Sequence, residues 1–283
     1  MTIKLFLNDE QAEVKSFVFN GGEVQVKLPP DGIKRMMWRN QALTTIKILA
    51  HLRNSQDIME LLMVTDALRR ELVGMQIPIH VQIPYFPYAR QDRVCDRGEA
   101  LGVKVVADLI NSQNYASVTI WDPHSDVTPA LLNNCHVIES YMFVDKIFSR
   151  SDFDKANKIL VSPDAGANKK VQKVAQVLRV PDVVRADKTR DVATGKITGT
   201  VAYTEHVGDK DFLILDDICD GGRTFVELAR TLSEKTDGKI YLYVTHGIFS
   251  AGFNELSHFI DHIYTANSFV DIPEEWSHFV TVL

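Results

Sequence analysis

The chain is predicted to have an α/β fold in which mainly parallel sheets form two similar domains, and three features of its sequence support this. Strand-like and helix-like patterns alternate along its 283 residues. The strand-like runs are short, apolar and rich in β-branched residues, which is typical of strands buried on both faces of a parallel sheet. Polar turns follow several of these runs, at the position where α/β sheets bind their ligands.

The alternation is clearest from residue 58 onward. Side chains that share one helical face predict a helix ending at Gly74, namely Ile58, Leu61, Leu62, Thr65, Leu68 and Leu72. The sequence IPIHVQIPYF (77–86) then predicts a strand, residues 101–112 a second helix, and SVTIWD (117–122) a second strand. These elements follow one another as the units of a parallel sheet do.

A boundary between two domains is expected near residues 140–155. The segment 139–157 mixes turn residues with charges, and KILVSPDAGANKKVQKVAQVL (158–178) then repeats the order strand, turn, helix. We therefore divide the chain into the domains 1–145 and 146–283. Residues 184–207 contain two glycine turns and no helical period, which predicts a strand leading into a mobile loop or a hairpin.

Composition is that of a cytoplasmic enzyme, since 45% hydrophobic residues are enough for two cores. A net charge of −6 argues against a nucleic-acid partner held by a basic surface. Cys95, Cys135 and Cys219 are too few and scattered for a disulfide framework or a zinc site, which fits a reducing compartment. No apolar run approaches the roughly 20 residues that span a bilayer, so we expect no membrane partner.

The most informative stretch is LILDDICDGGRT (213–224), where an apolar run breaks into acids, two glycines and a hydroxyl. The pattern predicts a buried strand followed by an anion-binding turn and a helix whose apolar face carries Phe225, Leu228, Ala229 and Leu232. Asp216 and Asp217 are then expected at the end of the strand, where they can accept two sugar hydroxyls or hold Mg²⁺. This favours an enzyme of ribose phosphates.

Four turns of this kind follow predicted strands. They are YARQDR (88–93), DPHSD (122–126), SPDAGANKK (162–170) and DDICDGGRT (216–224). A lone pair of aspartates is more often a solvated loop or a helix cap. Parallel sheets, however, bring such turns to one edge, where together they supply acids for metal, bases for phosphate and glycines for close backbone approach. That equipment is typical of phosphoryl or pyrophosphoryl transfer.

The motifs resemble those of the ribose-phosphate diphosphokinases, the phosphoribosyl pyrophosphate (PRPP) synthetase family. The similarity extends from about residue 19 to the C-terminus and is carried by IPYFPYARQDR, VKVVADLI, VSPDAGA, LDDICDGGRT and THGIFS. It implies two type I phosphoribosyltransferase-like domains, an N-terminal one that binds ATP and a C-terminal one that binds ribose phosphate. The implied reaction moves the β,γ-pyrophosphoryl group of ATP to the anomeric hydroxyl of a ribose phosphate and releases AMP.

The resemblance also implies roles for individual residues. Lys188 and Arg190 match the catalytic Lys-x-Arg of the family, where cations stabilise the transition state; the alternative is a solvated basic pair. Arg90 and Gln91 match its ATP-binding pair, and Arg93 either contacts ATP or forms a structural ion pair with Asp92. Glu23 matches an acid that contacts adenine from a neighbouring subunit, which implies a homo-oligomer.

Magnesium is the cofactor that the resemblance implies. His124 matches the histidine that binds the ATP-associated Mg²⁺, although a lone histidine near a strand end is more often structural. Asp164 matches the aspartate that holds a second metal near the ribose. Carboxylates, phosphates and waters are the ligands expected for Mg²⁺.

The phosphate loop departs from the family pattern Asp-Thr-Gly-Gly-Thr. This chain has Asp220, Gly221, Gly222, Arg223 and Thr224, so that one hydroxyl is lost and a cation is gained. Arg223 could reach a second phosphate on a 5′-extended acceptor, for which ADP-ribose is the candidate, in competition with ribose 5-phosphate. Its other interpretations are a side chain that points to solvent or one that strengthens binding of the ordinary phosphate.

Two other functions compete with the diphosphokinase. A phosphoribosyltransferase shares the acidic glycine loop but has no need of YARQDR or of a second α/β half. A catalytically silent regulatory relative would be expected to have lost its catalytic cations or metal ligands, yet Lys188, Arg190, His124 and Asp164 are all present.

Overall fold

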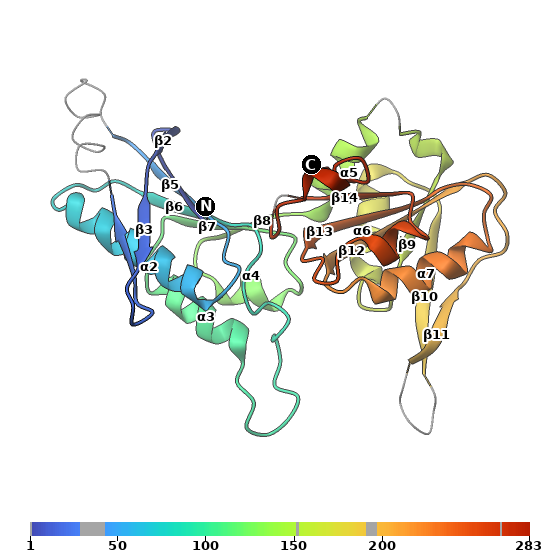
Figure 1. Ribbon diagram of the computed structural model, residues 1–283, viewed down its shortest axis with the longest axis horizontal. Helices are drawn as coiled ribbons and strands as arrows, with labels where there is room; N and C mark the ends of the chain where they lie inside the picture. Colours follow the sequence, from blue (N-terminus) through green and yellow to red (C-terminus); the bar gives the residue numbers. More distant parts are fainter. Residues whose placement is uncertain (1, 29–42, 151–152, 191–196, 267) are drawn as a thin grey trace. The chain divides into compact units, whose positions relative to one another are not determined.

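The computed structural model describes residues 2–28, 43–150, 153–190, 197–266 and 268–283, except for the side chains at 188–190, 197 and 198. The chain divides into two compact units, Met1–Ile138 and Glu139–Leu283. Figure 1 shows each unit as a sheet with helices packed against it. The helix α5 (Ser140–Phe148) belongs to the second unit, so the division falls at the start of this helix.

The described part of the first unit contains a six-stranded sheet in the order β2-β1-β5-β6-β7-β8. Strands β5 to β8 are parallel, and β1 is antiparallel to both of its neighbours. The strands are β1 (Ile3–Leu7), β2 (Glu10–Ala12), β5 (Ile46–Ala50), β6 (Ile79–Ile83), β7 (Ser117–Trp121) and β8 (Cys135–Ile138). A separate hairpin of β3 (Lys15–Val18) and β4 (Val24–Lys27) packs against the helix α2 (Ser55–Glu71).

The helices of the first unit are α2 (Ser55–Glu71), α3 (Gly102–Asn111) and α4 (Val127–Leu131). A capping box starts α2: the Asn54 side chain accepts a hydrogen bond from Asp57 N, and Asp57 Oδ2 accepts one from Asn54 N. Leu61, Val64 and Leu68 on its inner face are fully buried. The predicted helices at 58–72 and 101–112 are thus confirmed, and Gly74 follows α2 with a φ of 83°.

The second unit contains, among its described residues, a seven-stranded sheet in the order β11-β10-β9-β12-β13-β14-β15. In this order, all neighbouring strands are parallel except β10 and β11, which form an antiparallel hairpin. Its strands are β9 (Lys158–Ser162), β10 (Val183–Arg190), β11 (Ile197–Ala202), β12 (Asp211–Cys219), β13 (Ile240–Gly247), β14 (His262–Thr265) and β15 (Val280–Val282). Helices α6 (Asn168–Leu178), α7 (Arg223–Ser233) and α8 (Asn254–Ser257) accompany them.

The core of the second unit is built as the sequence predicts. Phe225, Leu228, Ala229 and Leu232 of α7 are all buried, in one hydrophobic cluster with Phe212 and Ile214 of β12. The predicted mainly parallel α/β fold is therefore confirmed. No helix in the described segments has both the length and the apolar character needed to cross a bilayer.

Two predicted strands differ from the observed ones, and a third element takes one of its two predicted forms. The strand predicted at 77–86 ends at Ile83, because Pro84 has no N–H for the sheet. The strand that carries Asp216 and Asp217 continues to Cys219, because β13 is long enough to pair with it as far as Gly247. Residues 184–207 form the hairpin alternative, and the loop itself, residues 191–196, lies outside the described residues.

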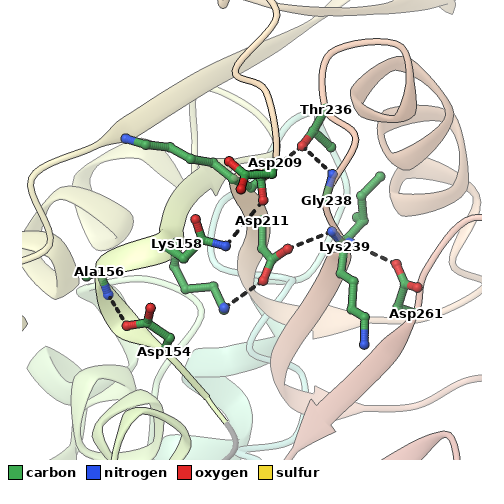
Figure 2. A network of polar contacts seen from close by, with 12 residues as sticks. Asp154, Ala156, Lys158, Asp209, Asp211, Thr236, Gly238, Lys239 and Asp261 are labelled. Carbon is green, nitrogen blue, oxygen red and sulfur yellow. Dashed lines mark hydrogen bonds and ion pairs between the residues drawn. The ribbon is translucent and has the colours of Figure 1, made fainter.

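Polar contacts fix the N-terminal ends of the strands in the second sheet (Figure 2). Lys158 Nζ donates to Asp211 Oδ2 over 2.6 Å, and Asp211 Oδ1 accepts Lys239 N over 2.7 Å. Ile240 N donates to Asp261 Oδ2. The network therefore joins the starts of β9, β12 and β13 at the edge opposite the glycine loop, and it leaves the carboxyl ends of these strands for other functions.

Candidate functional site

The predicted site residues of the first unit lie mainly at the carboxyl ends of β6 and β7. These strands are parallel neighbours, so the turns that follow them, 84–93 and 122–126, come to the same edge of the sheet. Within the first turn, Gln91 N donates to Tyr88 O over 2.8 Å, and Tyr88 has a φ of 60°. Arg90 and Gln91 are exposed.

The two turns are linked through Asp92. Burial alone would raise the pKa of Asp92. Hydrogen bonds from Ser125 and Arg93 outweigh this and hold the pKa below its ordinary value, and the charges of Arg93 and His124 add to the effect. Arg93 Nε lies 3.3 Å from Asp92 Oδ1, so the structural ion pair that the sequence allowed is present. Arg93 and His124 are thus brought together around one buried carboxylate.

Glu23 lies on the β3–β4 hairpin, which is separate from the six-stranded sheet. Phe19 N donates to Glu23 O and Gly22 N to Phe19 O, and Gly22 takes a φ of 89° that favours glycine. Glu23 itself is exposed at the tip, and Phe17 and Phe19 beside it are about half exposed. Glu23 is therefore exposed to solvent on this hairpin.

In the second unit, the structure gathers three carboxylates at the ends of β9 and β12. Asp164 Oδ1 accepts hydrogen bonds from Gly166 N and Ala167 N, which shapes the turn before α6. Burial raises the pKa of Asp216 well above its ordinary value, and the negative charges of Asp217 and Asp164 raise it further. A bound cation would offset this negative charge.

Lys170 is a cation of this site that the sequence argument did not single out. It lies in the first turn of α6, and its Nζ is 3.9 Å from Asp217 Oδ2. Its side chain is 24% exposed, against 9% for Asp217, so the pair is largely removed from solvent. Lys170 is the last residue of the predicted SPDAGANKK turn. The sequence argument expected basic residues of these turns to bind phosphate, but it did not give Lys170 a role of its own.

The glycine loop connects β12 to α7. Gly222 precedes the helix with a φ of 78°, and a Cβ atom at this position would lie 3.1 Å from Leu256 Cδ2, so both conformation and space favour glycine. The helix begins at Arg223 without a side-chain cap. The first N–H groups of a helix lack partners within it, and they suit an anion at this position.

Arg223 extends from the start of this helix into solvent. Its side chain is 87% exposed, and its Nε donates to Glu227 Oε1 over 2.8 Å. Glu227 follows four residues later on the same helical face, a spacing from which the contact could have been predicted. The guanidinium of Arg223 is therefore exposed beside Glu227 at the start of α7, and its role toward a phosphate stays a prediction.

The turn after β13 supports the loop from the other side. Ile248 N and Phe249 N both donate to Cys219 O, and Ser250 N donates to Asp220 O. Phe249 takes a φ of 48°, which is strained for a bulky residue, while its ring is buried 4.7 Å from that of Phe253. Packing of this ring thus compensates for the strained backbone. The THGIFS motif contains these residues, although the sequence gives no sign of their contacts.

Lys188 and Arg190 are in β10, where Lys188 pairs with Thr200 of β11 and Arg190 with Ile197. A register shift interrupts the pairing between Thr189 and Arg190. Their side chains lie outside the described residues, so their predicted catalytic role stays a prediction. Across the described part of the chain, no group of three or more His, Cys, Asp or Glu side chains is placed so that it could hold a metal ion.

Two family models match the chain. The N-terminal domain of ribose phosphate pyrophosphokinase matches residues 3–113, and the phosphoribosyl synthetase-associated domain matches residues 163–276. A ribose-phosphate pyrophosphokinase of Haemophilus ducreyi is 33% identical over 199 residues, which are 69% of this chain and 61% of that protein. The enzyme of the same name from Haemophilus influenzae is 32% identical over 226 residues, 78% of this chain and 69% of that protein.

The fold is also found in a solved structure. A phosphoribosylpyrophosphate synthetase from Mycobacterium smegmatis has a TM-score of 0.78 and 22% identity, over 98% of this chain and 87% of that one. At this identity the likeness concerns the fold. It agrees with two α/β units whose sheets are mostly parallel.

Proposed function

Because this chain belongs to the ribose-phosphate pyrophosphokinase family, we propose that it transfers the β,γ-pyrophosphoryl group of ATP to the anomeric hydroxyl of a ribose phosphate. The anomeric oxygen forms a bond to the β-phosphorus, and the bond from that phosphorus to the oxygen bridging it to the α-phosphorus breaks. AMP leaves with the bridging oxygen, and the hydroxyl proton passes to solvent. The products are AMP and a ribose 1-pyrophosphate.

One observation carries the proposal: Asp216 and Asp217 lie near the carboxyl end of β12, just before a glycine loop that opens a helix, and Asp164 follows the parallel neighbour β9 at the same edge of the sheet. In this proposal Asp216 and Asp217 accept hydrogen bonds from the two ribose hydroxyls, which fixes the position of the sugar ring. The loop residues Asp220, Gly221, Gly222 and Thr224 then surround the 5′-phosphate, and backbone N–H groups at the start of α7 donate to it. The anomeric hydroxyl is thereby held in one orientation for attack.

Nucleotide binding is assigned to the first unit. Arg90 supplies a guanidinium for phosphate and Gln91 an amide for hydrogen bonds. Arg93 and Glu23 complete the proposed ATP-binding set. Lys188 and Arg190 provide positive charge that stabilises the negative oxygens of the pyrophosphoryl group in the transition state. Lys188 acts as a point charge and Arg190 as a bidentate hydrogen-bond donor.

The acidic site is suited to Mg²⁺, because burial raises the pKa of Asp216 and the negative charges of Asp217 and Asp164 raise it further, and a bound cation would offset these charges. Asp164 would hold such an ion near the ribose, and His124 would hold the one that accompanies ATP. When bound, Mg²⁺ neutralises phosphate charge, and it usually takes only one or two protein carboxylates, with phosphates and waters as its other ligands. The protein residues in turn orient the substrates and keep Asp217 paired with Lys170.

Arg223 favours a larger acceptor than ribose 5-phosphate. Arg223 stands at the start of α7, where the acceptor phosphate would bind, and its Nε is hydrogen-bonded to Glu227. The side chain is 87% exposed, so it is accessible to a ligand. A guanidinium in that position can contact a second phosphate beyond the first. We therefore favour a 5′-extended ribose such as ADP-ribose, with ribose 5-phosphate as the competing acceptor.

An oligomer is part of the proposal. Glu23 is exposed at the tip of a hairpin that also exposes Phe17 and Phe19. The family acid that Glu23 matches contacts adenine in a neighbouring subunit, and on this resemblance we expect a homo-oligomer.

The test is release of AMP from Mg-ATP by the purified protein, with ribose 5-phosphate and ADP-ribose in parallel and mass spectrometry of each product. A gain of one pyrophosphoryl group on either sugar supports the transfer and names the acceptor. The Lys188→Ala variant should lose about 10²-fold or more in kcat while it keeps its ATP affinity. No AMP with any sugar, despite ATP binding, would favour a silent binding relative, and consumption of PRPP with a base would favour a phosphoribosyltransferase.

A further inference from the structure

Gly102, the first residue of α3, lies directly against the side chain of Gln91. A Cβ atom added at Gly102 would be 2.3 Å from Gln91 Oε1 and 3.1 Å from both Gln91 Cδ and Tyr88 Cδ1. The first distance is too short for any carbon and oxygen that are not bonded to each other. The amide of Gln91 thus occupies the space that a side chain at position 102 would need.

Conformation does not account for this glycine. Its φ lies outside the left-handed region, and the residue is buried at the start of a regular helix. In a helix interior, glycine is less favourable than alanine by up to about 1 kcal/mol. Helix propensity therefore gives no reason for glycine at this position, whereas the space taken by the Gln91 amide excludes alanine.

The backbone around Gln91 is fixed to the same helix. Val103 N donates to Gln91 O over 3.2 Å, and Gln91 N donates to Tyr88 O. The Tyr88 hydroxyl is in turn 3.1 Å from Ser55 Oγ, at the start of α2. These contacts attach the turn to both α2 and α3. The side chain of Gln91 lies over α3, in the space that the missing Cβ of Gly102 leaves open.

We propose that Gly102 is a positioning residue for nucleotide binding, which holds the Gln91 amide over the start of α3 in the orientation that meets ATP. The inference rests on the proposed function in one respect, namely that Gln91 contacts the nucleotide. Gly102 acts only through Gln91 and does not itself touch the ligand.

The Gly102→Ala variant has an unusual expected phenotype. The atom nearest to the new methyl group is the end of a flexible side chain, so the amide moves and the backbone stays. Helix propensity then keeps the melting temperature equal to or above that of the unmodified protein. The dissociation constant of Mg-ATP should rise about three- to tenfold, as expected for loss of one hydrogen bond.

The experiment is calorimetric titration of Mg-ATP, without acceptor, into the full chain and into Gly102→Ala, Gln91→Ala and the double variant, with the melting temperature of each. The double variant should bind no more weakly than Gln91→Ala alone, because the methyl group has nothing left to displace. Val105→Ala, at a position of α3 that is 55% exposed, is the matched control and should bind ATP normally.

Three results would overturn the inference. The first is unchanged ATP affinity in Gly102→Ala. The second is that the losses of affinity in Gly102→Ala and Gln91→Ala add independently in the double variant. The third is a melting temperature that falls in Gly102→Ala and is not restored when Gln91→Ala is added. Coupled losses of ATP affinity in a protein that releases no AMP would uphold the inference and reject the proposed reaction, so the two failures can be told apart.

Discussion

The hydroxyl of Ser250 donates a hydrogen bond to Asp220 Oδ1 over 2.6 Å, and Ser250 N donates to Asp220 O over 3.1 Å. The turn after β13 thereby holds the first residue of the glycine loop by both its carboxylate and its backbone. Because Asp220 precedes Gly221 and Gly222, its orientation sets the path of the loop into α7. Ser250 therefore acts on the proposed phosphate site without belonging to it.

Replacement of Ser250 by alanine should weaken binding of the acceptor sugar. Loss of this hydrogen bond is expected to raise the KM for the acceptor about three- to tenfold while the KM for ATP stays unchanged. Steady-state kinetics with each substrate varied in turn measures both values. Ser250→Thr, which keeps the hydroxyl, should restore most of the affinity. An equal rise in both KM values would point instead to general damage of the fold.

Replacement of Arg223 by glycine should shift the choice of acceptor. If the guanidinium reads a second phosphate, the ratio of kcat/KM for ADP-ribose to that for ribose 5-phosphate should fall about tenfold or more, the value of one charge-assisted contact. Arg230→Ala is the matched control on the same helix, since that guanidinium lies over the Phe259 ring. An unchanged ratio in Arg223→Gly would show that the arginine does not select the acceptor.

The Lys158–Asp211 pair should be important for stability but not for chemistry. Both side chains are largely buried, 4% and 12% exposed, and Lys158 Nζ also lies 4.5 Å from the centre of the Phe153 ring. Lys158→Met leaves the Asp211 carboxylate buried without its partner and should lower the free energy of unfolding by about 3–5 kcal/mol.

The double variant Lys158→Met/Asp211→Asn provides the check. Its asparagine can still accept the hydrogen bond from Lys239 N, so it should recover more than half of the loss. Urea titrations followed by circular dichroism give the free energies. A double variant that is as unstable as the two single changes combined would show that the charges do not compensate each other.

Stability should depend on pH through Glu60, which is 8% exposed on α2. Burial raises the pKa of Glu60 above its ordinary value, and the charge of Asp57 adds to this, while a hydrogen bond with Ser16 opposes it. Because the pKa of Glu60 is higher in the folded protein than in the unfolded chain, protonation of its carboxyl group favours folding. This stabilising effect is fully present below about pH 4 and is lost as the pH rises through the folded pKa.

Glu60→Gln removes this dependence. The variant should be more stable than the unmodified protein at pH 7, and the difference should disappear near pH 4. Melting temperatures between pH 4 and pH 7.5 measure the effect. A variant that is less stable by the same amount at both ends would mean that the contact with Ser16, rather than burial of charge, governs this position.

Much of the fold could be predicted because it depends on local patterns. The apolar spacing in α2, α3 and α7 and the short apolar runs of β7 and β12 each correspond to an observed element. Boundaries were less accurate, since the end of a strand depends on its neighbours: β12 runs past Asp216 and Asp217 to Cys219 because β13 pairs with it there.

The sequence by itself determined the fold class and the turns that carry the candidate site, because helical spacing, strand runs and motifs are properties of neighbouring residues. Only the tertiary structure decided which side chains meet. Ser250 and Asp220 are thirty residues apart in the chain. Lys170 belongs to α6 and Asp217 to β12. Gly102 lies against the side chain of Gln91. Such contacts depend on how strands pair and helices pack, so they follow from the position of whole elements and leave no periodic trace in the chain.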